Sequence, residues 1–415
     1  MVGHFGSENV RMHRTPSVKC YLREMKYLLC SWGKSIGVPA FVFLVFTIIS
    51  CSSGTEAPPP STTPTPVTPV TPTPPPVRTD FSGTIRDLTS FELLDEMGVG
   101  WNLGNSFDVI SSDKTAWGNP LPTSGQISLV KQMGFGTLRI PITWGFNQSE
   151  FFPYTIESAY LDRVQEVINL GLQQQMHVII NIHHDDDWLR PTLDDAEVAT
   201  DRLASLWTQV AERFQSYGDS LIFESINEPR LVGSPEEWTG GTEEGRSVLN
   251  GFHQTSVDAI RGTGGNNERR HIMISTYAAS TVPEAMDALV IPNDDPNIFI
   301  SLHSYFPWEF AGLEGGTSEW GSETDRSALA AELDKIREKW IVQENRPVVL
   351  GEWGTINKNN VEERLEYVQY YASEAAERGL LTIVWDDGGN FGMLDRSGLV
   401  WRFPQLARGI VESSQ

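Results

Sequence analysis

The sequence predicts an α/β fold, a (β/α)8 TIM barrel built by one domain that follows an export signal and a linker rich in proline and threonine. From about residue 80 onward, eight short apolar runs alternate with segments of helical period, which favours a parallel barrel. Nearly every run ends in polar or aromatic residues, and such barrels gather their functional groups at the carboxyl ends of the strands. A doubly wound open sheet is the alternative, but no strand is followed by a glycine-rich phosphate-binding loop.

Residues 1–51 are typical of an export signal. A basic region precedes an apolar stretch over 38–49 that is too short to span a bilayer stably. The stretch ends in Ile-Ile-Ser-Cys, which resembles a bacterial lipoprotein cleavage box with Cys51 as the lipidated residue. The basic region is long for such a signal, so an internal methionine such as Met25 is a candidate start. A cleaved signal with an incidental cysteine is the alternative, and both predict an exported protein, held at a bacterial cell surface or secreted.

Residues 52–79 are predicted to form a linker between this segment and the globular domain over 80–415. Between residues 57 and 78 the sequence is almost only Pro, Thr, Ser and Val. Such a composition cannot bury a core, and it favours an extended spacer of the polyproline type.

Composition limits the partners of the domain. The chain has a formal net charge of −23 although its first fifty residues are basic, so the globular part should not seek nucleic acid or anionic lipid. A neutral glycan fits better, and the 13 tryptophans suit sugar stacking, although tryptophan is equally ordinary core material. The only cysteines are Cys20, Cys30 and Cys51, so the domain has no disulfide, thiolate metal site or cysteine nucleophile.

The predicted strands are apolar runs of the kind that a parallel sheet buries on both faces. They cover residues 99–105, 137–144, 177–184, 221–229, 271–277, 298–305, 347–353 and 381–386. Between them, apolar residues three or four positions apart predict amphipathic helices. The stripes are Leu161, Val164, Val167 and Ile168; Leu203, Leu206, Val210 and Phe214; Leu329, Leu333, Ile336 and Trp340; and Leu365, Val368 and Ala372. Gly171 follows the first stripe where a helix C-cap glycine is expected.

The carboxyl ends of the runs supply polar and aromatic side chains rather than aliphatic ones. The pattern as a whole indicates a functional site more strongly than any one member does. The candidate residues at these ends are Asn105, Arg139, His183, His184, Asn227, Glu228, Tyr277, His303, Tyr305, Glu352 and Trp385.

Two of these ends carry glutamates, Glu228 on the fourth run and Glu352 on the seventh. Pro229 cannot donate to a strand ladder, so strand pairing should stop there and leave Glu228 at the rim. Two carboxyl groups across a cleft suit glycoside hydrolysis, in which one is protonated and the other is ionised. The charge of Glu352 would raise the proton affinity of Glu228. A salt bridge at the barrel rim is the alternative for either glutamate taken alone.

Neighbouring residues suggest how this pair is held. Arg139 lies in an apolar run and needs a carboxylate partner when buried, for which Glu352 is a candidate. His303 and Tyr305 are two residues apart and should face the same side of a strand.

Adjacent histidines, His183 and His184, precede three aspartates and raise the question of a metal site. Neighbours on a strand point to opposite faces and cannot chelate one ion together, so no metal is predicted. Trp385 ends the last run, where its indole would stack under the sugar at the cleavage site. Three further tryptophans lie just beyond strands and either line a longer groove or pack under loops: Trp144, Trp188 and Trp308.

Several segments of the domain resemble glycoside hydrolase family 5, retaining β-glycosidases on a β/α barrel, and in particular its subfamily 4 of endoglucanases and xyloglucanases. The segments follow the family's order over nearly the whole of residues 80–412. They are GWNLGN (100–105), WGNP (117–120), LRIPITW (138–144), INIHHD (180–185), FESINEPR (223–230), YAAS (277–280), SLHSY (301–305) and GEWG (351–354). The subfamily usually ends its eighth strand Trp-Trp-Asp-Asn-Gly, but residues 384–388 read Val-Trp-Asp-Asp-Gly, so no hydrogen bond is carried over to Asp387.

The resemblance implies that Glu228 is the general acid and base and that Glu352 is the nucleophile of a two-step reaction. It implies that Asn227 binds the sugar 2-hydroxyl, and the two carboxyl groups should lie about 5–5.5 Å apart if configuration is retained. The residues implied to form the shell of the cleavage subsite are Arg139, His183, Asn227, His303, Tyr305 and Trp385. The other candidate substrate-binding residues are Asn105, His184, Trp188 and Trp308.

We therefore expect an exported, lipid-anchored and monomeric endo-β-1,4-glucanase that acts without a cofactor on xyloglucan, mixed-linkage glucan or both. A β-mannanase or a plain cellulase on the same scaffold is the nearest alternative. A surface glycan-binding lipoprotein that has lost catalysis is another, against which the pair of glutamates argues. A metal-dependent hydrolase is the third.

Overall fold

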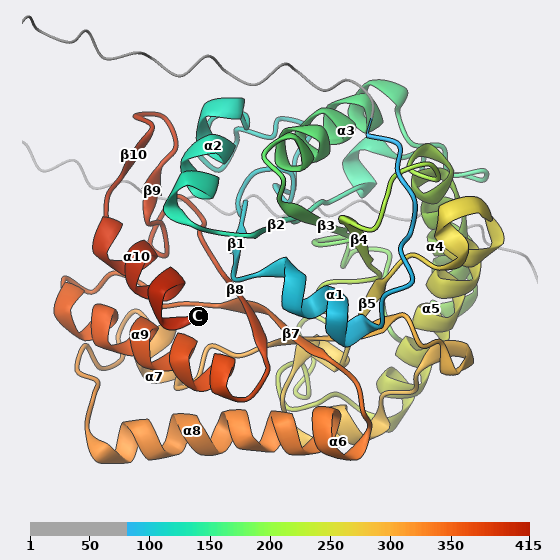
Figure 1. Ribbon diagram of the computed structural model, residues 1–415. Helices are drawn as coiled ribbons and strands as arrows, with labels where there is room; N and C mark the ends of the chain where they lie inside the picture. Colours follow the sequence, from blue (N-terminus) through green and yellow to red (C-terminus); the bar gives the residue numbers. More distant parts are fainter. Residues whose placement is uncertain (1–80) are drawn as a thin grey trace, which may run out of the picture. The chain divides into compact units, whose positions relative to one another are not determined.

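A computed structural model describes residues 81–415, so the predictions for the signal over 1–51, for Cys51 and for the linker over 52–79 lie outside the described residues. Within 81–415, eight parallel strands close into a barrel in their order along the chain (Figure 1). The predicted (β/α)8 fold is confirmed. The strands are β1 (Gly100–Asn102), β2 (Thr137–Ile140), β3 (His177–Asn181), β4 (Leu221–Glu224), β5 (Ile272–Ser275), β6 (Ile298–His303), β7 (Val348–Trp353) and β8 (Leu381–Val384).

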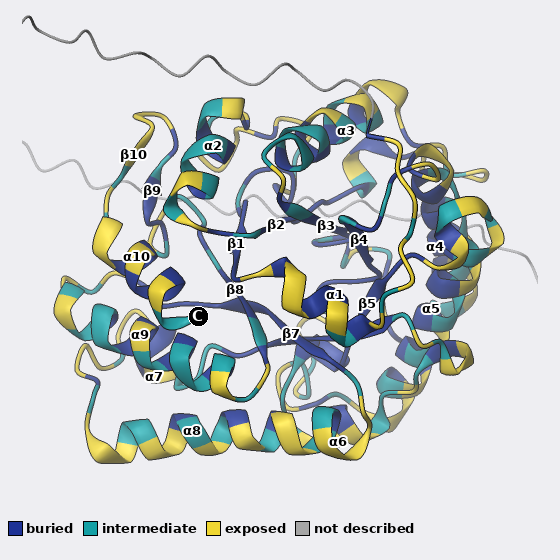
Figure 2. Cartoon of the chain, viewed as in Figure 1, coloured by how far each residue is buried: buried dark blue, intermediate teal, exposed yellow. Residues whose placement is uncertain are grey.

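Helices surround this barrel, with buried faces toward the strands and exposed faces outward (Figure 2). They are α1 (Ser90–Met97), α2 (Ser124–Met133), α3 (Ser158–Gln173), α4 (Ala196–Arg213), α5 (Glu243–Gly262), α6 (Pro283–Ala288), α7 (Trp308–Ala311), α8 (Glu323–Arg337), α9 (Val361–Glu377) and α10 (Pro404–Ser413). A hairpin of β9 (Leu394–Asp395) and β10 (Val400–Trp401) follows β8. None of the helices within 81–415 has the length and apolar character needed to cross a membrane.

The barrel interior changes from apolar to polar along the strands. One layer of inward side chains packs against Leu93, Leu94 and Met97 of α1; it comprises Ile179, Ile222, Met273, Phe299, Val349 and Ile383. The carbonyl of Met97 accepts a hydrogen bond from Thr137 at the start of β2 (2.9 Å), so α1 closes the amino-terminal end. Alternate strand residues share a face, so positions 181, 224 and 301, two residues further on, continue the inward rows as Asn, Glu and Ser. The polar layer therefore lies toward the carboxyl end.

Gly171 does not end a helix, and the prediction of a C-cap glycine is wrong. Helix α3 continues to Gln173, and Gly171 is buried in its last turn. A Cβ at this position would lie 2.7 Å from Cγ2 of Val178 and 3.0 Å from Cδ2 of Leu138. Glycine is therefore required here because it lets α3 approach β2 and β3 closely.

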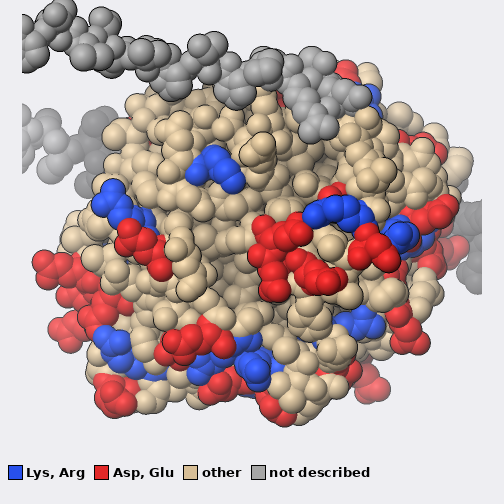
Figure 3. All heavy atoms as spheres, viewed as in Figure 1, with Lys and Arg blue, Asp and Glu red and all other residues tan. Residues whose placement is uncertain are grey.

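The surface around α1 carries both signs of charge, and acidic side chains form the larger patches there (Figure 3). This agrees with the formal net charge of −23 for the whole chain. The face opposite α1 carries the carboxyl ends of the strands, where the candidate residues gather.

Candidate active site

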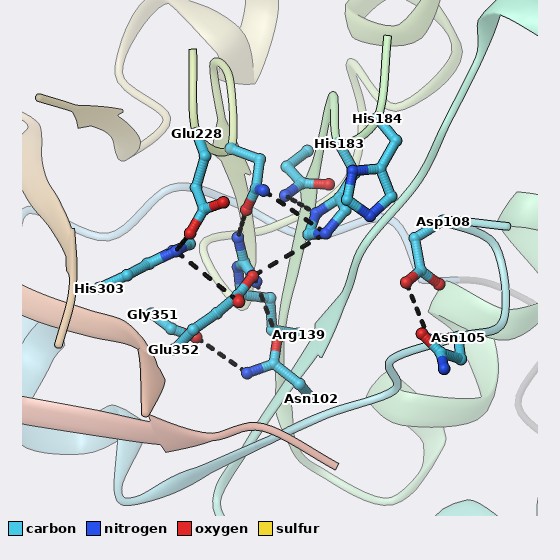
Figure 4. A network of polar contacts seen from close by, with 12 residues as sticks. Asn102, Asn105, Asp108, Arg139, His183, His184, Glu228, His303, Gly351 and Glu352 are labelled. Carbon is cyan, nitrogen blue, oxygen red and sulfur yellow. Dashed lines mark hydrogen bonds and ion pairs between the residues drawn. The ribbon is translucent and has the colours of Figure 1, made fainter. Parts of the chain in front are cut away.

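Arg139 on β2 is the centre of a buried hydrogen-bond network at the carboxyl end of the barrel (Figure 4). Its guanidinium donates to Oε1 of Glu352 (2.8 Å), which is the expected ion pair, and to Oε2 of Glu224 (2.7 Å). It also donates to Oδ1 of Asn102 (2.9 Å) and to Oδ1 of Asn227 (2.6 Å). Burial alone would lower the pKa of Arg139, but the charges of Glu224 and Glu352 outweigh burial and raise it. Arg139 is therefore a fixed cation that holds the carboxylates of Glu224 and Glu352.

Glu224 is a member of this network that sequence analysis did not single out. It is fully buried on β4 and also accepts hydrogen bonds from Nδ2 of Asn181 (3.0 Å) and Oγ of Ser301 (2.6 Å). The sequence signal that could have identified Glu224 is its position two residues after Ile222, because alternation then places its charge on the same face of an apolar run. Because Glu224 is fully buried and both of its oxygens accept hydrogen bonds, it holds Arg139 in place rather than facing the cleft.

The substitution Glu224→Ala is expected to lower the free energy of unfolding by about 3–5 kcal/mol, because it leaves a buried guanidinium with one carboxylate fewer. Urea denaturation measured by tryptophan fluorescence tests this. The control is Glu96→Ala, which removes a partner of Arg86 at a site where the Glu96 side chain is 44% exposed. That change should cost less than about 1 kcal/mol. Equal losses in the two variants would contradict the structural role of Glu224.

Glu352 points into the barrel mouth because of an irregularity in β7. Leu302 pairs with Leu350 but His303 pairs with Glu352, so Gly351 is an extra residue in β7. Without this bulge, alternation from the inward Val349 would turn position 352 outward. A Cβ at Gly351 would lie 3.1 Å from both Nε2 of His303 and Oγ of Ser301, so the bulge favours glycine. Tyr305 donates to the second oxygen of Glu352, Oε2 (3.1 Å).

Glu228 lies beyond its strand, since β4 ends at Glu224 and not at Pro229 as predicted. Oε1 of Glu228 lies 2.7 Å from Nδ1 of His303, and the same nitrogen is 3.7 Å from Oε2 of Glu352. The three groups offer ligand-type atoms that all lie within 4.8 Å of one another. A carboxyl oxygen of Glu228 is therefore within 4.8 Å of one of Glu352, which agrees with the close pair of carboxyl groups, about 5–5.5 Å apart, that is typical of retaining glycosidases.

The pKa of Glu228 reflects burial and the contact with His303. Burial raises the pKa of Glu228, but the hydrogen bond and charge of His303 outweigh burial and lower it. The expectation that the charge of Glu352 raises the proton affinity of Glu228 stays a prediction; on Glu352 itself, burial and the charge of Glu228 both raise the pKa. A proton in the bond between Nδ1 of His303 and Oε1 of Glu228 is nevertheless one short transfer from Glu228.

Asn227 and His183 complete the wall beside this pair. Oδ1 of Asn227 accepts from Arg139, so its Nδ2 donor is directed elsewhere, with Nε2 of His183 3.4 Å away. Nε2 of His183 is 3.9 Å from Oε1 of Glu352. The indole of Trp385 stacks parallel to the His183 ring, with ring centroids 5.8 Å apart and 3° between the planes. The network thus brings Asn227, His183 and Trp385 together with the predicted residues Arg139, Glu228, His303, Tyr305 and Glu352.

His183 and His184 do not point to opposite faces, and that prediction is wrong. Strand β3 ends at Asn181, so alternation no longer applies, and the two rings lie 4.3 Å apart. Within 81–415, donor atoms of Asp108, His183 and His184 lie within 4.8 Å of one another, as they do for Glu228, His303 and Glu352.

Two members of the first group, His183 and Asp108, already use ligand atoms in hydrogen bonds. Nδ1 of His183 accepts from Asn181 (3.1 Å), and both oxygens of Asp108 accept from the backbone amides of residues 105 and 106. The second group is the carboxylate pair itself. The expectation that no metal binds therefore remains a prediction.

Four other candidates lie around the network. Asn105 adopts a positive φ (51°) and sits beside Asp108, to the side of the carboxylate pair (Figure 4). Trp308 is 53% exposed and meets Tyr305 edge to face. Trp188 is half-buried, donates to Asp185 (3.0 Å), and has the guanidinium of Arg202 over its ring. Trp144, in contrast, is buried in the core.

Asp387, where the sequence departs from the subfamily pattern, stabilises the loop after β8. Its Oδ1 accepts hydrogen bonds from the backbone amides of Gly389 (2.7 Å) and Phe391 (3.0 Å). Oδ1 of an asparagine would serve equally as the acceptor, so the departure leaves this turn intact.

Known proteins match the described domain over most of its length. Endoglucanase B of Clostridium cellulovorans is 43% identical over 341 residues, which are 80% of this chain and 77% of that protein. Endoglucanase A of Ruminococcus albus is 38% identical, over 80% of this chain and 95% of that protein. The structure of ZgEngAGH5_4 in complex with a cellotriose is 51% identical and covers 79% of this chain and 100% of its own, with a TM-score of 0.78.

A solved GH5-4 broad specificity endoglucanase from Clostridium acetobutylicum is 47% identical and covers 78% of this chain and 100% of its own, with a TM-score of 0.77. Residues 99–390 match the family described as Cellulase (glycosyl hydrolase family 5). The closed barrel and the paired glutamates agree with this match. The chain therefore belongs to glycosyl hydrolase family 5 and is a glycoside hydrolase.

Proposed function

We propose that this chain is a retaining endo-β-1,4-glucanase in which Glu352 is the nucleophile and Glu228 is the general acid and base. The observation that carries the proposal is the short distance, within 4.8 Å, between a carboxyl oxygen of Glu228 and one of Glu352 at the carboxyl end of the barrel. Closely spaced carboxyl groups suit direct attack by a carboxylate, whereas inverting enzymes hold theirs further apart to admit a water molecule.

The contacts of each glutamate fit its role. Glu352 accepts hydrogen bonds on both oxygens, from Arg139 and Tyr305, which orient the carboxylate for attack on the anomeric carbon. Glu228 receives its proton from the bond with His303 and donates it to the departing glycosidic oxygen. In the second step Glu228 takes a proton from water, which attacks the glycosyl ester and releases Glu352. The Nδ2 donor of Asn227 is available for the sugar 2-hydroxyl.

Xyloglucan and mixed-linkage glucan are the substrates we propose among β-1,4-glucans. Several similar solved structures are described as GH5-4 broad specificity endoglucanases, and one at 35% identity is described as a lichenase. Exposed indoles such as those of Trp117 (42%) and Trp308 (53%) flank His184 and Tyr305, and they are suited to stack on a long glucan.

A polysaccharide panel tests the substrate class. We expect reducing sugar from xyloglucan, mixed-linkage barley glucan and carboxymethylcellulose, and little from mannan. Proton NMR of the first product should give the β-anomer, because two displacements restore configuration. Release from mannan alone would contradict the proposal, as would an α-anomer. Activity lost with a chelator and restored by zinc would favour the metal-dependent alternative.

Hydrolysis should follow a bell-shaped pH profile. Burial raises the pKa of Glu352 above 4.5, so protonation of the nucleophile removes activity on the acidic side. Burial alone would lower the pKa of His303, but the charge of Glu352 and the hydrogen bond to Glu228 outweigh burial and raise it above 6.5. The proton shared with Glu228 is thus present below that pKa and lost as pH rises through it.

His303→Gln removes one proton site and should move the alkaline limb of the kcat/KM profile to lower pH. An unmoved limb would exclude His303 from proton supply.

We also propose export and anchoring through Cys51, and a monomeric catalytic domain. Support for export and anchoring comes from the apolar stretch and the cleavage box of the sequence. Cys51→Ala should move the protein from the membrane fraction to the medium, measured by immunoblot of fractionated cells. Retention of the variant in the membrane fraction would exclude this anchor.

A further inference from the structure

The carboxyl group of Glu228 has a basic side chain beside each of its oxygens. Oε1 lies 2.7 Å from Nδ1 of His303, and this contact is drawn in Figure 4. Oε2 lies 3.8 Å from Nη1 of Arg230, two residues further along the chain. The charges of Glu352 on β7 and of His184 after β3 also act on Glu228. The mechanism above uses His303 and leaves Arg230 without a role.

Arg230 is fixed by groups other than the carboxyl group of Glu228. Its Nη1 donates to the backbone carbonyl of Glu228 (2.9 Å), and its Nε donates to Oε1 of Glu237 (3.1 Å). Oε2 of Glu237 in turn accepts a hydrogen bond from the backbone amide of Gly233 (2.7 Å). The guanidinium also lies over the indole of Trp238, 4.7 Å from the ring centroid. Arg230 is therefore held beside Glu228 whether or not that carboxyl group is ionised.

Asp186, in the loop after β3, is a second carboxylate beside the same nitrogen. Its Oδ1 lies 3.7 Å from Nη1 of Arg230, which is 3.8 Å from Oε2 of Glu228. Both distances exceed those of hydrogen bonds, so Arg230 acts on the two carboxyl groups as a charge. The side chains of Arg230 and Glu228 are only 11% and 15% exposed, so water screens this charge weakly.

Asp186 is ionised in the pH range where Glu228 loses its proton on the alkaline side. Burial raises the pKa of Asp186 to about 6, and the charge of Arg230 opposes this rise. Above that pH, Asp186 is an anion near Glu228, with Arg230 between them as the cation. The two charges therefore act on the Glu228 proton in opposite directions.

We propose that Arg230 and Asp186 are positioning residues of opposite charge that act through Glu228: the cation favours its ionised form, and the anion favours its protonated form. This rests on the proposed function, because only a general acid and base needs both forms in one cycle. The first step requires the proton on Glu228, and the second requires the carboxylate. The cation alone would favour the base at the expense of the acid, and the pair keeps both forms accessible.

The alkaline limb of the kcat/KM profile on cellohexaose tests the pair, because this limb reports loss of the proton shared by Glu228 and His303. Arg230→Gln removes the cation, so the proton is held more tightly and the limb should move to higher pH, by about 0.5–1 unit. Asp186→Asn removes the anion, so the limb should move to lower pH, by about 0.3–0.5 unit. Arg230→Lys keeps the charge and should return the limb most of the way to its wild-type position.

The matched control is Arg86→Gln, which removes a cation far from Glu228. Arg86 pairs with Glu96 of α1, at the amino-terminal end of the barrel, and its side chain is 46% exposed. A charge this distant and exposed is screened, so the limb should stay within about 0.2 unit of the wild-type position.

Opposite shifts in Arg230→Gln and Asp186→Asn would support the proposal, because a damaged loop lowers the rate without moving the limb in two directions. Shifts in the same direction, or a limb that either folded variant leaves unmoved, would overturn it. Thermal unfolding checks that each variant is folded. If Arg230→Gln does not fold, Asp186→Asn decides alone: a shift to lower pH supports the pair, and any other result overturns it. Failure of the proposed function is seen separately, as a wild-type enzyme that releases no reducing sugar from cellohexaose or glucan.

Discussion

Glu352→Ala is expected to reduce hydrolysis of β-glucan by about 10⁴-fold or more, the largest effect of any single substitution in this chain. The carboxylate that would form the covalent intermediate is lost, and no second carboxylate can replace it. Glu228 is needed as the acid, and Glu224 is enclosed by Arg139, Asn181 and Ser301. Initial rates on xyloglucan and on an aryl β-cellobioside measure the effect, and both should fall together because both need the nucleophile.

Azide distinguishes loss of the nucleophile from a damaged site. The alanine variant leaves a space where Glu352 stood, so azide can attack the anomeric carbon from that face while Glu228 protonates the leaving oxygen. One displacement inverts configuration, and the product is an α-glycosyl azide with the free phenol. Full activity of Glu352→Ala would remove Glu352 from the mechanism. A β-glycosyl azide would reassign Glu352 to proton transfer.

Binding should survive this substitution, because most of the wall remains. Asn227, His183 and Trp385 keep their own partners, although Arg139 loses one of its two carboxylates. Calorimetric titration with cellotetraose should give a dissociation constant within about 10-fold of that of Glu352→Gln, which keeps the shape of the side chain.

Local patterns predicted the barrel and the two glutamates because each depends on neighbours in the sequence. Apolar runs and helical stripes are visible in single segments, and Glu228 and Glu352 each follow an apolar run. The bulge at Gly351 was not predictable in the same way, because it depends on pairing with His303 on another strand. The point where β3 ends was also missed, and with it the contact between the rings of His183 and His184.

Tertiary burial explains the remaining errors. Gly171 has the same local setting as a C-cap glycine, and only the approach of α3 to Val178 and Leu138 shows its role. The source of the Glu228 proton could not be predicted either. It depends on a 2.7 Å contact between Glu228 and His303, residues separated by 75 positions in the chain. Charge effects of this kind follow from distances that a sequence does not contain.

Glu228→Ala is expected to separate substrates by the acidity of their leaving groups. Glucan, whose leaving alkoxide needs a proton, should lose about 10³–10⁴-fold in kcat/KM. An aryl β-cellobioside with an acidic phenol needs little protonation, so its first step should stay fast while the second step, which lacks the base, becomes limiting. The glycosyl ester on Glu352 should then accumulate, seen as a burst of phenol and as a mass increase of the protein.

Azide added to Glu228→Ala tests the same assignment from the opposite side. Azide needs no base, so it should replace water in the second step, speed turnover of the aryl substrate, and give a β-glycosyl azide after two displacements. Glu228→Gln is the matched variant, because it keeps the shape of the side chain and should accept azide less readily. An α-glycosyl azide, or losses equal on both substrates, would mean that Glu228 is not the acid. Opposite azide stereochemistry in the Glu228 and Glu352 variants can arise only if the two carboxylates have different roles.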